Sequence, residues 1–357
     1  MNQRKPYPFY ILELTKYCNN NCIYCYNYWK QPGAICSKEE LSTKQWFYII
    51  DKLDKETQCA TLALSGGEPV IRKDFLEILS FISEKGIKPI LITNAALIDE
   101  KMAKAVVERG VSLVEITLLS SKKDIHNKMA KANVWDKVLE AIVNFKSLGI
   151  KVIIVFVATK LNLPTFRQTL ELAIALNTDG LMFNRFNPGG EGIRHLEELL
   201  PDIKELEEAL QIAQNYSYYY RYPISCSIPM QPCLFNMQAY PKLGRGFCSA
   251  GTEKAYYTIG PDGKVRPCNH TPTVIGDYFK QSMEEIQKSE VLEEFKKAFP
   301  PICKPCPMNT VCQGGCKASA QVCYGSIYEE EPCLKVNIPN HPLLSKAKED
   351  LKKLSPC

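Results

Sequence analysis

Residues 17–26 read Tyr-Cys-Asn-Asn-Asn-Cys-Ile-Tyr-Cys-Tyr, and they place Cys18, Cys22 and Cys25 in a C-x3-C-x2-C arrangement. Thiolate is the ligand that iron–sulfur clusters use, and a complete four-iron cluster normally takes four cysteines. A loop that supplies three leaves one iron free to chelate a small molecule. A structural zinc loop is the alternative, but zinc needs a fourth ligand nearby to close its tetrahedron. The stretch therefore predicts a four-iron cluster with one open iron.

The composition is that of an ordinary globular chain. Of its 357 residues, 45% are hydrophobic and 23% are charged, which suits one large core and a smaller module. The net charge of +5 is too diffuse to indicate nucleic acid, although it is compatible with an acidic peptide partner. No signal sequence is visible, and the longest apolar run, Val152–Ala158, is far too short to span a bilayer. We therefore expect a cytoplasmic protein that binds neither nucleic acid nor membrane.

From residue 9 to residue 186, apolar runs alternate with amphipathic helical stretches. Ser42 to Gln45 resembles a capping box that opens one helix, and another is expected from about Val134 to Gly149. Repeated right-handed strand–helix–strand units curl a parallel sheet into an open barrel. The predicted fold class is therefore α/β, a partial (β/α)6 barrel, with its chemistry at the carboxyl ends of the strands. The predicted strands are Phe9–Thr15, Ala60–Ser65, Pro89–Thr93, Leu113–Leu118, Lys151–Thr159 and Leu181–Phe186.

The second predicted strand ends in Ser65-Gly66-Gly67-Glu68-Pro69, the GGEP segment. Two consecutive glycines at a strand end allow the backbone to approach a ligand closely. A tight turn would explain the segment equally well if it stood alone. Its position after the C-x3-C-x2-C loop favours a ligand-binding role.

The three cysteines, Tyr24, the apolar strand Phe9–Leu14 and the GGEP segment together resemble the radical S-adenosylmethionine (SAM) superfamily. The resemblance implies that the open iron binds the amino and carboxylate groups of SAM. One electron from the reduced cluster then splits SAM into methionine and a 5′-deoxyadenosyl radical, which takes a hydrogen atom from the substrate. It also implies that the GGEP backbone binds the SAM amino group and that Glu68 orders the loop.

Further cofactor contacts are expected at the ends of later strands. Asn94 and Thr117 stand in segments that depart from the usual Thr-Asn-Gly and Ser-Leu-Asp-Gly but keep an amide or a hydroxyl. Arg185 suits the SAM carboxylate as a bidentate clamp, or equally an ion pair at the rim. His126 has no visible partner, and we interpret it as structural. The predicted cofactor-binding residues are Tyr24, Ser65, Gly66, Gly67, Glu68, Pro69, Asn94, Thr117 and Arg185.

The glycine-rich segment 187–192 suits neither a helix nor a strand, so we place the edge of the barrel domain there. A helix is expected to open near Pro201-Asp202, and the tyrosines between residues 216 and 222 are expected to pack under a linker rather than to line a peptide groove. The predicted division is a barrel over residues 1–190, a helical linker over 191–244, a cysteine-rich domain over 245–340 and a tail over 341–357.

A second group of cysteines fills the last third of the chain. With 16 cysteines in all and no export signal, we interpret these spacings as metal ligands and not as disulfides. Zinc remains the alternative. Three further cysteines, Cys36, Cys59 and Cys357, show no ligand spacing. The group consists of Cys248, Cys268, Cys303, Cys306, Cys312, Cys316 and Cys333, with a hairpin turn at Pro261-Asp262-Gly263 between the first two.

This order is similar to the SPASM extension of radical SAM enzymes that act on peptides and proteins. The resemblance implies one auxiliary cluster held by Cys303, Cys306, Cys312 and Cys333, and another held by Cys248, Cys268 and Cys316. The second set lacks one thiolate. The candidates for the missing ligand are Glu253, Cys226, Cys233, Cys323 and the substrate itself.

From these resemblances we expect a radical SAM enzyme that modifies a side chain of a peptide or protein, such as a ribosomally made precursor peptide. An electron donor such as flavodoxin or ferredoxin is implied. Three alternatives stay open: an anaerobic sulfatase-maturing (formylglycine-generating) enzyme, a tetrapyrrole or quinone biosynthesis enzyme, and a non-enzymatic iron–sulfur or zinc scaffold. Only about eight residues precede the first predicted strand, too few for a folded leader-binding domain. We therefore expect any leader to be recognised by the barrel, by the SPASM region or by a separate protein.

Overall fold

Six parallel strands form the centre of the sheet in the computed structural model, which describes residues 4–31, 33–34 and 39–337. They follow the chain in the order β1-β2-β3-β4-β5-β6. Each begins and ends within one residue of its predicted bounds, so the predicted partial barrel is confirmed. The strands are β1 Phe9–Thr15, β2 Thr61–Gly66, β3 Lys88–Thr93, β4 Leu113–Thr117, β5 Lys151–Ala158 and β6 Gly180–Arg185.

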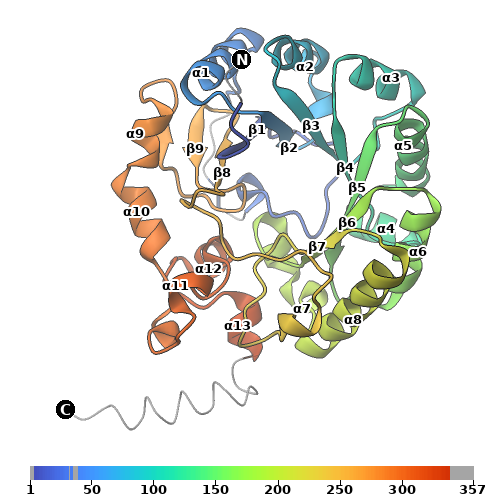
Figure 1. Ribbon diagram of the computed structural model, residues 1–357, viewed down its shortest axis with the longest axis vertical. Coiled ribbons are helices and arrows are strands. Elements are labelled where there is room, and N and C mark those ends of the chain that lie inside the picture. Colours follow the sequence, from blue (N-terminus) through green and yellow to red (C-terminus); the bar gives the residue numbers. More distant parts are fainter. Residues whose placement is uncertain (1–3, 32, 35–38, 338–357) are drawn as a thin grey trace.

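Helices cover the outer face of this curved sheet, and the sheet does not close on itself (Figure 1). The largest core lies between the strands and the helices, where Trp46, Phe75, Phe145 and Phe156 are buried. The helices that connect the six strands are α1 Thr43–Thr57, α2 Phe75–Glu84, α3 Glu100–Glu108, α4 Lys123–Ala130, α5 Trp135–Ser147 and α6 Phe166–Ala175, with 3-10 turns η1 Tyr28–Lys30, η2 Pro69–Ile71 and η3 Leu163–Thr165.

Two of these helices begin where the sequence predicts. The Ser42 side chain accepts from the Gln45 N–H and the Gln45 side chain accepts from the Ser42 N–H, which makes the predicted capping box at the start of α1. Helix α5 follows Val134 and buries Val138, Ala141, Ile142 and Phe145 on one side.

The chain beyond β6 adds further strands to the same sheet. Strand β8 pairs in parallel with β1, from Phe9 opposite Tyr256 to Leu12 opposite Ile259. The predicted hairpin is present, because β8 and β9 pair antiparallel around the turn. Its attachment to β1 was not predicted, and it covers what would otherwise be an exposed strand edge. The added strands are β7 Ile224–Ser225, which pairs with β6, then β8 Tyr256–Ile259, β9 Lys264–Arg266 and β10 Gly276–Asp277.

The segment after β6 is more regular than its glycines suggest. A 3-10 helix, η4 Gly190–His195, begins inside the predicted break, so the expectation that no helix would form there is wrong. Helix α8 Ile203–Tyr220 starts at a capping box between Asp202 and Glu205, as predicted near Pro201-Asp202. In the tyrosine cluster, Tyr216 and Tyr222 are buried, whereas Tyr218, Tyr219 and Tyr220 are exposed. The remaining elements are α7 Leu196–Leu199, η5 Met237–Ala239, α9 Met283–Gln287, α10 Glu290–Lys297, η6 Pro301–Cys303, α11 Asn309–Cys312, α12 Lys317–Tyr324 and α13 Pro332–Asn337.

Among the described residues, no helix has both the length and the apolar character needed to cross a membrane. The predicted tail, as well as Cys36 and Cys357, lies outside the described residues.

Candidate functional site: a three-cysteine loop at the mouth of the barrel

The loop that carries Cys18, Cys22 and Cys25 leaves the carboxyl end of β1, where barrel chemistry is expected. The N–H of Cys25 donates to the Cys22 carbonyl (3.2 Å), and Ile23 anchors the loop because its N–H donates to the Met129 carbonyl (3.0 Å). Burial, together with the neighbouring thiols of Cys25 and Cys18, raises the pKa of Cys22 to about 12. Burial also raises the pKa of Cys18 and of Cys25. The three thiols are thus neighbours, and a bound cation would be needed to hold them as thiolates.

The GGEP segment at the end of β2 is hydrogen-bonded to the start of this loop. The Gly67 N–H donates to the Thr15 carbonyl (2.7 Å), and the Glu68 N–H donates to the Tyr17 carbonyl (2.8 Å). A Cβ on Gly67 would overlap the Tyr17 carbonyl oxygen and lie 2.6 Å from the Tyr17 carbonyl carbon. Gly66 has a φ of +124°, and a Cβ there would overlap the Thr15 oxygen. The glycines are therefore needed for a close approach to the cysteine loop; their contact with SAM stays a prediction.

Glu68 joins this arrangement to the next strand. Its buried carboxylate accepts from the Thr93 hydroxyl (2.8 Å) and from the Asn94 N–H (2.8 Å). Burial raises the pKa of Glu68 to about 7, although these hydrogen bonds oppose the shift. The Asn94 side chain donates to Asn19 Oδ1 (3.0 Å) and lies 3.6 Å from Cys18 Sγ. The ends of β1, β2 and β3 are thereby fixed to one another, and Glu68 orders the loop in the way that the resemblance implies.

Of the other predicted cofactor-binding residues, four lie near the cysteine loop and one, Arg185, does not. Tyr24 is half-buried, and its hydroxyl is within electrostatic reach of Cys22, Cys25 and Cys18. Ser65 lies buried in register with Glu13 of β1, and Thr117 is half-buried at the end of β4. The structure brings these residues to the mouth of the barrel with the cysteine loop. Pro69, the first residue of η2, is buried there too.

Arg185 does not lie in this group, because its guanidinium is taken by another partner. Arg185 donates to Glu331 Oε1 (2.6 Å) and to the Pro229 carbonyl (2.9 Å), and both members of the ion pair are buried. Arg185 therefore forms an ion pair, which was the alternative prediction. This pair lies in the interior of the protein and not at the rim of the barrel. His126 is also buried and accepts from the Leu119 N–H (3.3 Å), as the structural interpretation predicts.

One acidic residue inside the barrel was overlooked in the sequence. Val114 and Ile116 of β4 point into the core beneath the helices, so Glu115 between them faces the inside of the barrel. Its neighbours in register are Ile92 of β3 and Ile153 of β5. Burial alone raises the pKa of Glu115 to about 7, and within the described residues its carboxylate has no hydrogen-bond or ion-pair partner. The sequence signal for Glu115 is that it is the one charged residue in the apolar predicted strand Leu113–Leu118.

We expect Glu115→Gln to stabilise the apo-protein at pH 8 by about 1–2 kcal/mol and to leave it unchanged near pH 4. The folded-state pKa lies above the unfolded-state value, so the wild type loses stability as the pH rises from about 4.5 to about 7, and the glutamine variant lacks this contribution. Urea denaturation curves at several pH values measure the difference. Equal midpoint shifts at pH 4 and pH 8 would contradict a desolvated carboxylate at Glu115 that has no partner among the described residues.

The cysteines of the SPASM region lie in two neighbourhoods. In the first, Cys268, Cys248 and Cys316 are all within electrostatic reach of the Tyr256 hydroxyl. Burial raises the pKa of Cys316 to about 12, and the Asn187 amide donates to its sulfur (3.2 Å). The second neighbourhood contains Cys303, whose thiol is within electrostatic reach of those of Cys233, Cys312 and Cys306. Within the described ranges, no three Cys, His, Asp or Glu side chains are arranged so that they could bind one metal ion. We therefore group the cysteines by which thiols are neighbours.

A stack of two rings joins the first neighbourhood to the cysteine loop. The Tyr26 ring, directly after Cys25, lies 4.0 Å from the His270 ring, and the Asn269 amide donates to the Tyr26 hydroxyl (2.7 Å). His270 Nδ1 lies 3.1 Å from the same Asn187 nitrogen that donates to Cys316. Packed side chains therefore connect the SPASM cysteines to the cysteine loop of the barrel.

The groups around these cysteines fit iron–sulfur clusters. Lys317 is buried within electrostatic reach of Cys248 and Cys316, and burial lowers its pKa to about 8. Among the described residues, its ammonium donates to two backbone carbonyl oxygens and to the Gln313 side-chain amide oxygen. Arg185 Nη1 and Gln231 Nε2 are buried without an acceptor in the described part of the chain. Cluster sulfides and thiolates would supply both a counter-charge and acceptors for these donors.

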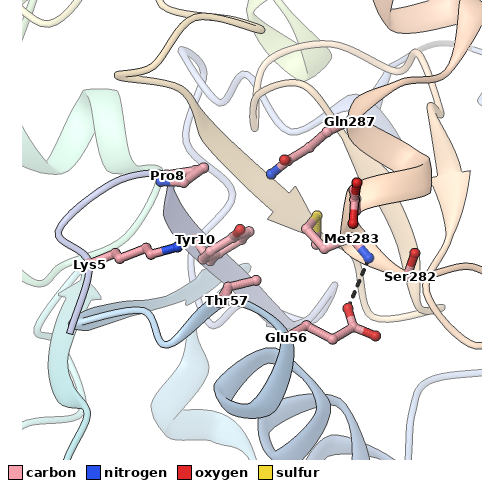
Figure 2. Close-up of a pocket in the computed structure, with 9 residues that line it drawn as sticks. Lys5, Pro8, Tyr10, Glu56, Thr57, Ser282, Met283 and Gln287 are labelled. Atoms are coloured by element: carbon pink, nitrogen blue, oxygen red, sulfur yellow. Dashed lines mark hydrogen bonds between the residues drawn. The ribbon is translucent and has the colours of Figure 1, made fainter. Parts of the chain in front are cut away.

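A cavity of about 450 Å³ lies elsewhere, between the start of β1, α1 and α9 (Figure 2). Tyr10, Glu56 and Met283 are among the residues that line it. It sits at the amino end of β1, opposite to the cysteine loop, and contains none of the predicted site residues.

Two family models match the chain where the geometry places the two groups of cysteines. The radical SAM superfamily model matches residues 12–173, and an iron–sulfur cluster-binding domain, SPASM, matches residues 248–307. Residues 12–173 of this chain therefore form a radical SAM domain. This radical SAM enzyme carries a SPASM domain, and its cofactors are SAM with a four-iron cluster and auxiliary clusters.

Curated relatives and solved structures extend the match over nearly the whole radical SAM enzyme. A PqqA peptide cyclase of Bradyrhizobium diazoefficiens is 24% identical over 95% of this chain and 88% of its own length. A PqqA peptide cyclase of Rhodopseudomonas palustris is 26% identical over 95% and 89%. Streptococcus suis SuiB bound to the precursor peptide SuiA has a TM-score of 0.70 at 15% identity, over 90% of this chain and 74% of that one. Native anSMEcpe with bound AdoMet has a TM-score of 0.69 at 19% identity, over 96% and 100%. These structures share the fold.

Proposed function

We propose that the enzyme modifies a side chain of a ribosomally made precursor peptide by radical chemistry. The observation that carries the proposal is that PqqA peptide cyclases match 95% of the chain, through both cysteine regions. A chain that needed only the barrel chemistry would have no reason to match the cysteine-rich region of peptide cyclases as well.

The residues at the mouth of the barrel have different roles in binding the cofactors. When bound at the three-cysteine loop, SAM supplies the 5′-deoxyadenosyl radical that removes a hydrogen atom from the substrate. Cys18, Cys22 and Cys25 would hold the cluster. Tyr24 closes one side of the thiols, and Asn94 bonds to the loop next to Cys18. We infer that the cofactor lies over this edge and that the target side chain enters from the open side of the barrel.

The inner face of the barrel suits such a side chain. Ile92, Ile153 and Val155 line it together with Glu115, and all four are half-buried. Apolar walls exclude water from the reacting atoms, and a single carboxyl group can hold or accept a proton near neutral pH. We propose that Glu115 faces the substrate segment that is modified.

An external one-electron donor, such as flavodoxin or ferredoxin, is part of the proposal. The cluster must be reduced before each cleavage of SAM, and the net charge of +5 is compatible with an acidic protein donor.

Co-expression with short peptides encoded beside the gene, followed by mass spectrometry, tests the proposal. We expect one peptide to change mass only when the enzyme is present with an intact three-cysteine loop. If every candidate peptide keeps its mass while 5′-deoxyadenosine still forms, the proposal of a peptide substrate is contradicted. The radical SAM chemistry is not contradicted by that result. Oxidation of cysteine or serine to formylglycine would instead favour the sulfatase-maturing alternative.

A further inference from the structure

The cavity at the amino end of β1 lies between parts of the chain that the two family models match separately (Figure 2). Helix α1 belongs to the radical SAM match and helix α9 to the SPASM match. The volume of about 450 Å³ is within the range of small-molecule sites, about 300–1,000 Å³, and such sites commonly form where two structural units meet. Because the cavity contains none of the predicted site residues, a ligand bound there would be separate from the radical chemistry.

Hydrogen bonds between distant segments hold the walls of the cavity in place. The Lys5 N–H donates to the Gln58 carbonyl (2.9 Å), and the Lys5 carbonyl accepts from the Ala60 N–H (2.9 Å). At the start of α9, the Met283 N–H donates to Glu56 Oε2 (2.9 Å). The N-terminal segment, the end of α1 and the start of α9 are therefore joined around the cavity, which is formed before any ligand binds.

A buried hydroxyl group without a partner borders the cavity. Tyr10 lines it, its side chain is buried, and its hydroxyl has no hydrogen-bond partner among the described residues. Burial raises the pKa of Tyr10; Thr57 and Gln287 are close enough to oppose this shift, although neither forms a hydrogen bond with the hydroxyl in the described ranges. The Thr57 hydroxyl donates instead to the Leu53 carbonyl (2.7 Å). An unpartnered buried hydroxyl destabilises the folded chain unless a ligand or an ordered water bonds to it.

The free polar groups around this hydroxyl are mainly hydrogen-bond donors. Figure 2 shows the Lys5 ammonium and the Gln287 side-chain amide both pointing into the cavity. Within the part of the chain that the structure describes, the Lys5 ammonium has no hydrogen-bond or ion-pair partner. An ammonium offers three donors and no acceptor, and a side-chain amide offers two donors. The cavity therefore lacks an acceptor that carries negative charge for Lys5.

The two carboxylates of the cavity walls already have partners. Glu56 accepts from the Tyr278 hydroxyl (2.9 Å), and its other oxygen lies 3.8 Å from the Lys52 ammonium. Glu284 is exposed and forms an ion pair with Lys288. Both negative charges are therefore compensated by groups of the chain, whereas the positive charge of Lys5 is not.

We propose that this cavity binds a carboxylate group carried on an apolar stem. The carboxylate would accept from the Lys5 ammonium and from the Tyr10 hydroxyl, because hydrogen bonds to an ionised acceptor are the strongest that these donors can form. Pro8 and Met283 provide an apolar wall for the stem. The same group can come from a free carboxylic acid or from an acidic side chain of a peptide. The site does not depend on which reaction the enzyme catalyses.

Ligand-observed NMR titrations of the full-length enzyme with hexanoate test the site, and hexylammonium is the probe of opposite charge. We expect hexanoate to bind and hexylammonium to bind at least about tenfold more weakly. Lys5→Met keeps an apolar stem but removes the charge, so it should weaken hexanoate binding by about tenfold or more. Lys55→Met is the matched control, because Lys55 lies on α1, pairs with Asp51 and does not line the cavity. Equal affinity of the wild type and Lys5→Met for hexanoate would overturn the proposal.

Tyr10→Phe separates a ligand-binding role of the hydroxyl from a packing role. Since the hydroxyl has no partner among the described residues, its loss should not lower the midpoint of thermal unfolding of the ligand-free enzyme. The same substitution should weaken hexanoate binding by about threefold or more, so that hexanoate raises the unfolding midpoint less than in the wild type. A variant that unfolds at a lower temperature and binds hexanoate as tightly as the wild type would contradict the proposal.

Two acetylated and amidated tripeptides, Leu-Glu-Leu and Leu-Gln-Leu, identify the source of the carboxylate. Binding of the glutamate peptide but not of the glutamine peptide would support an acidic peptide side chain as the ligand. Binding of hexanoate alone would support a free carboxylic acid. If neither hexanoate nor the glutamate peptide binds, the site is wrong. The reconstituted Lys5→Met enzyme is expected to release as much 5′-deoxyadenosine as the wild type, so failure of this proposal is distinguishable from failure of the proposed function.

Discussion

Cys22→Ala is expected to abolish the release of 5′-deoxyadenosine from SAM. Cys22 is the central thiol of the loop, between Cys18 and Cys25, and its removal leaves two donors for the cluster. Loss of an outer partner of a metal ligand already costs about 10–100-fold, so loss of the ligand itself should exceed about 100-fold. Chromatography of the anaerobic reaction with dithionite measures the product.

Cys59→Ala is the matched control for this prediction. Cys59 is buried in the core below the barrel and has no ligand spacing, so its removal should change stability slightly and leave the yield of 5′-deoxyadenosine within about twofold. A Cys22→Ala enzyme that cleaves SAM as fast as the Cys59→Ala enzyme would contradict the assignment of the loop.

Gly67→Ala is expected to displace the cysteine loop and to reduce SAM cleavage by about 100-fold or more, because a small misplacement at a reacting centre costs that much. The added Cβ would overlap the carbonyl oxygen of Tyr17, which is backbone and has no other rotamer to adopt. Overpacking of this kind also costs about 1–3 kcal/mol of folding free energy. Iron content, thermal unfolding and 5′-deoxyadenosine release together measure the effect.

Gly246→Ala serves as the control for Gly67→Ala. A Cβ on Gly246 meets no atom within 4 Å, so the same chemical change is made in open space. We expect Gly246→Ala to keep the wild-type iron content and SAM cleavage. If Gly67→Ala behaves like Gly246→Ala, the close approach of β2 to the cysteine loop is not needed for cluster binding.

The barrel could be predicted because its signals are local. Each strand is a short apolar run bounded by turn residues, and the helix starts at Ser42 and Asp202 are marked by side chains that cap the backbone within three residues. The three-cysteine loop and the GGEP segment are local as well. Their joint position at the ends of β1 and β2 follows from the parallel order of the strands.

What the sequence could not show depends on pairs that are distant in the chain. Arg185 was considered for the SAM carboxylate, yet its partner Glu331 lies 146 residues further on. The pairing of β8 with β1 joins residues 256–259 to residues 9–12. Neither contact leaves a periodic or spacing signal.

We expect Cys18, Cys22 and Cys25 to leave one iron of the cluster open and SAM to bind at that iron. EPR of the dithionite-reduced protein, recorded before and after addition of SAM, tests this most directly. We predict that SAM changes the spectrum of one cluster in the wild type and changes nothing in the Cys18→Ala/Cys22→Ala/Cys25→Ala variant. A wild-type spectrum that SAM leaves unaltered, with SAM recovered intact under the same reduction, would contradict the claim.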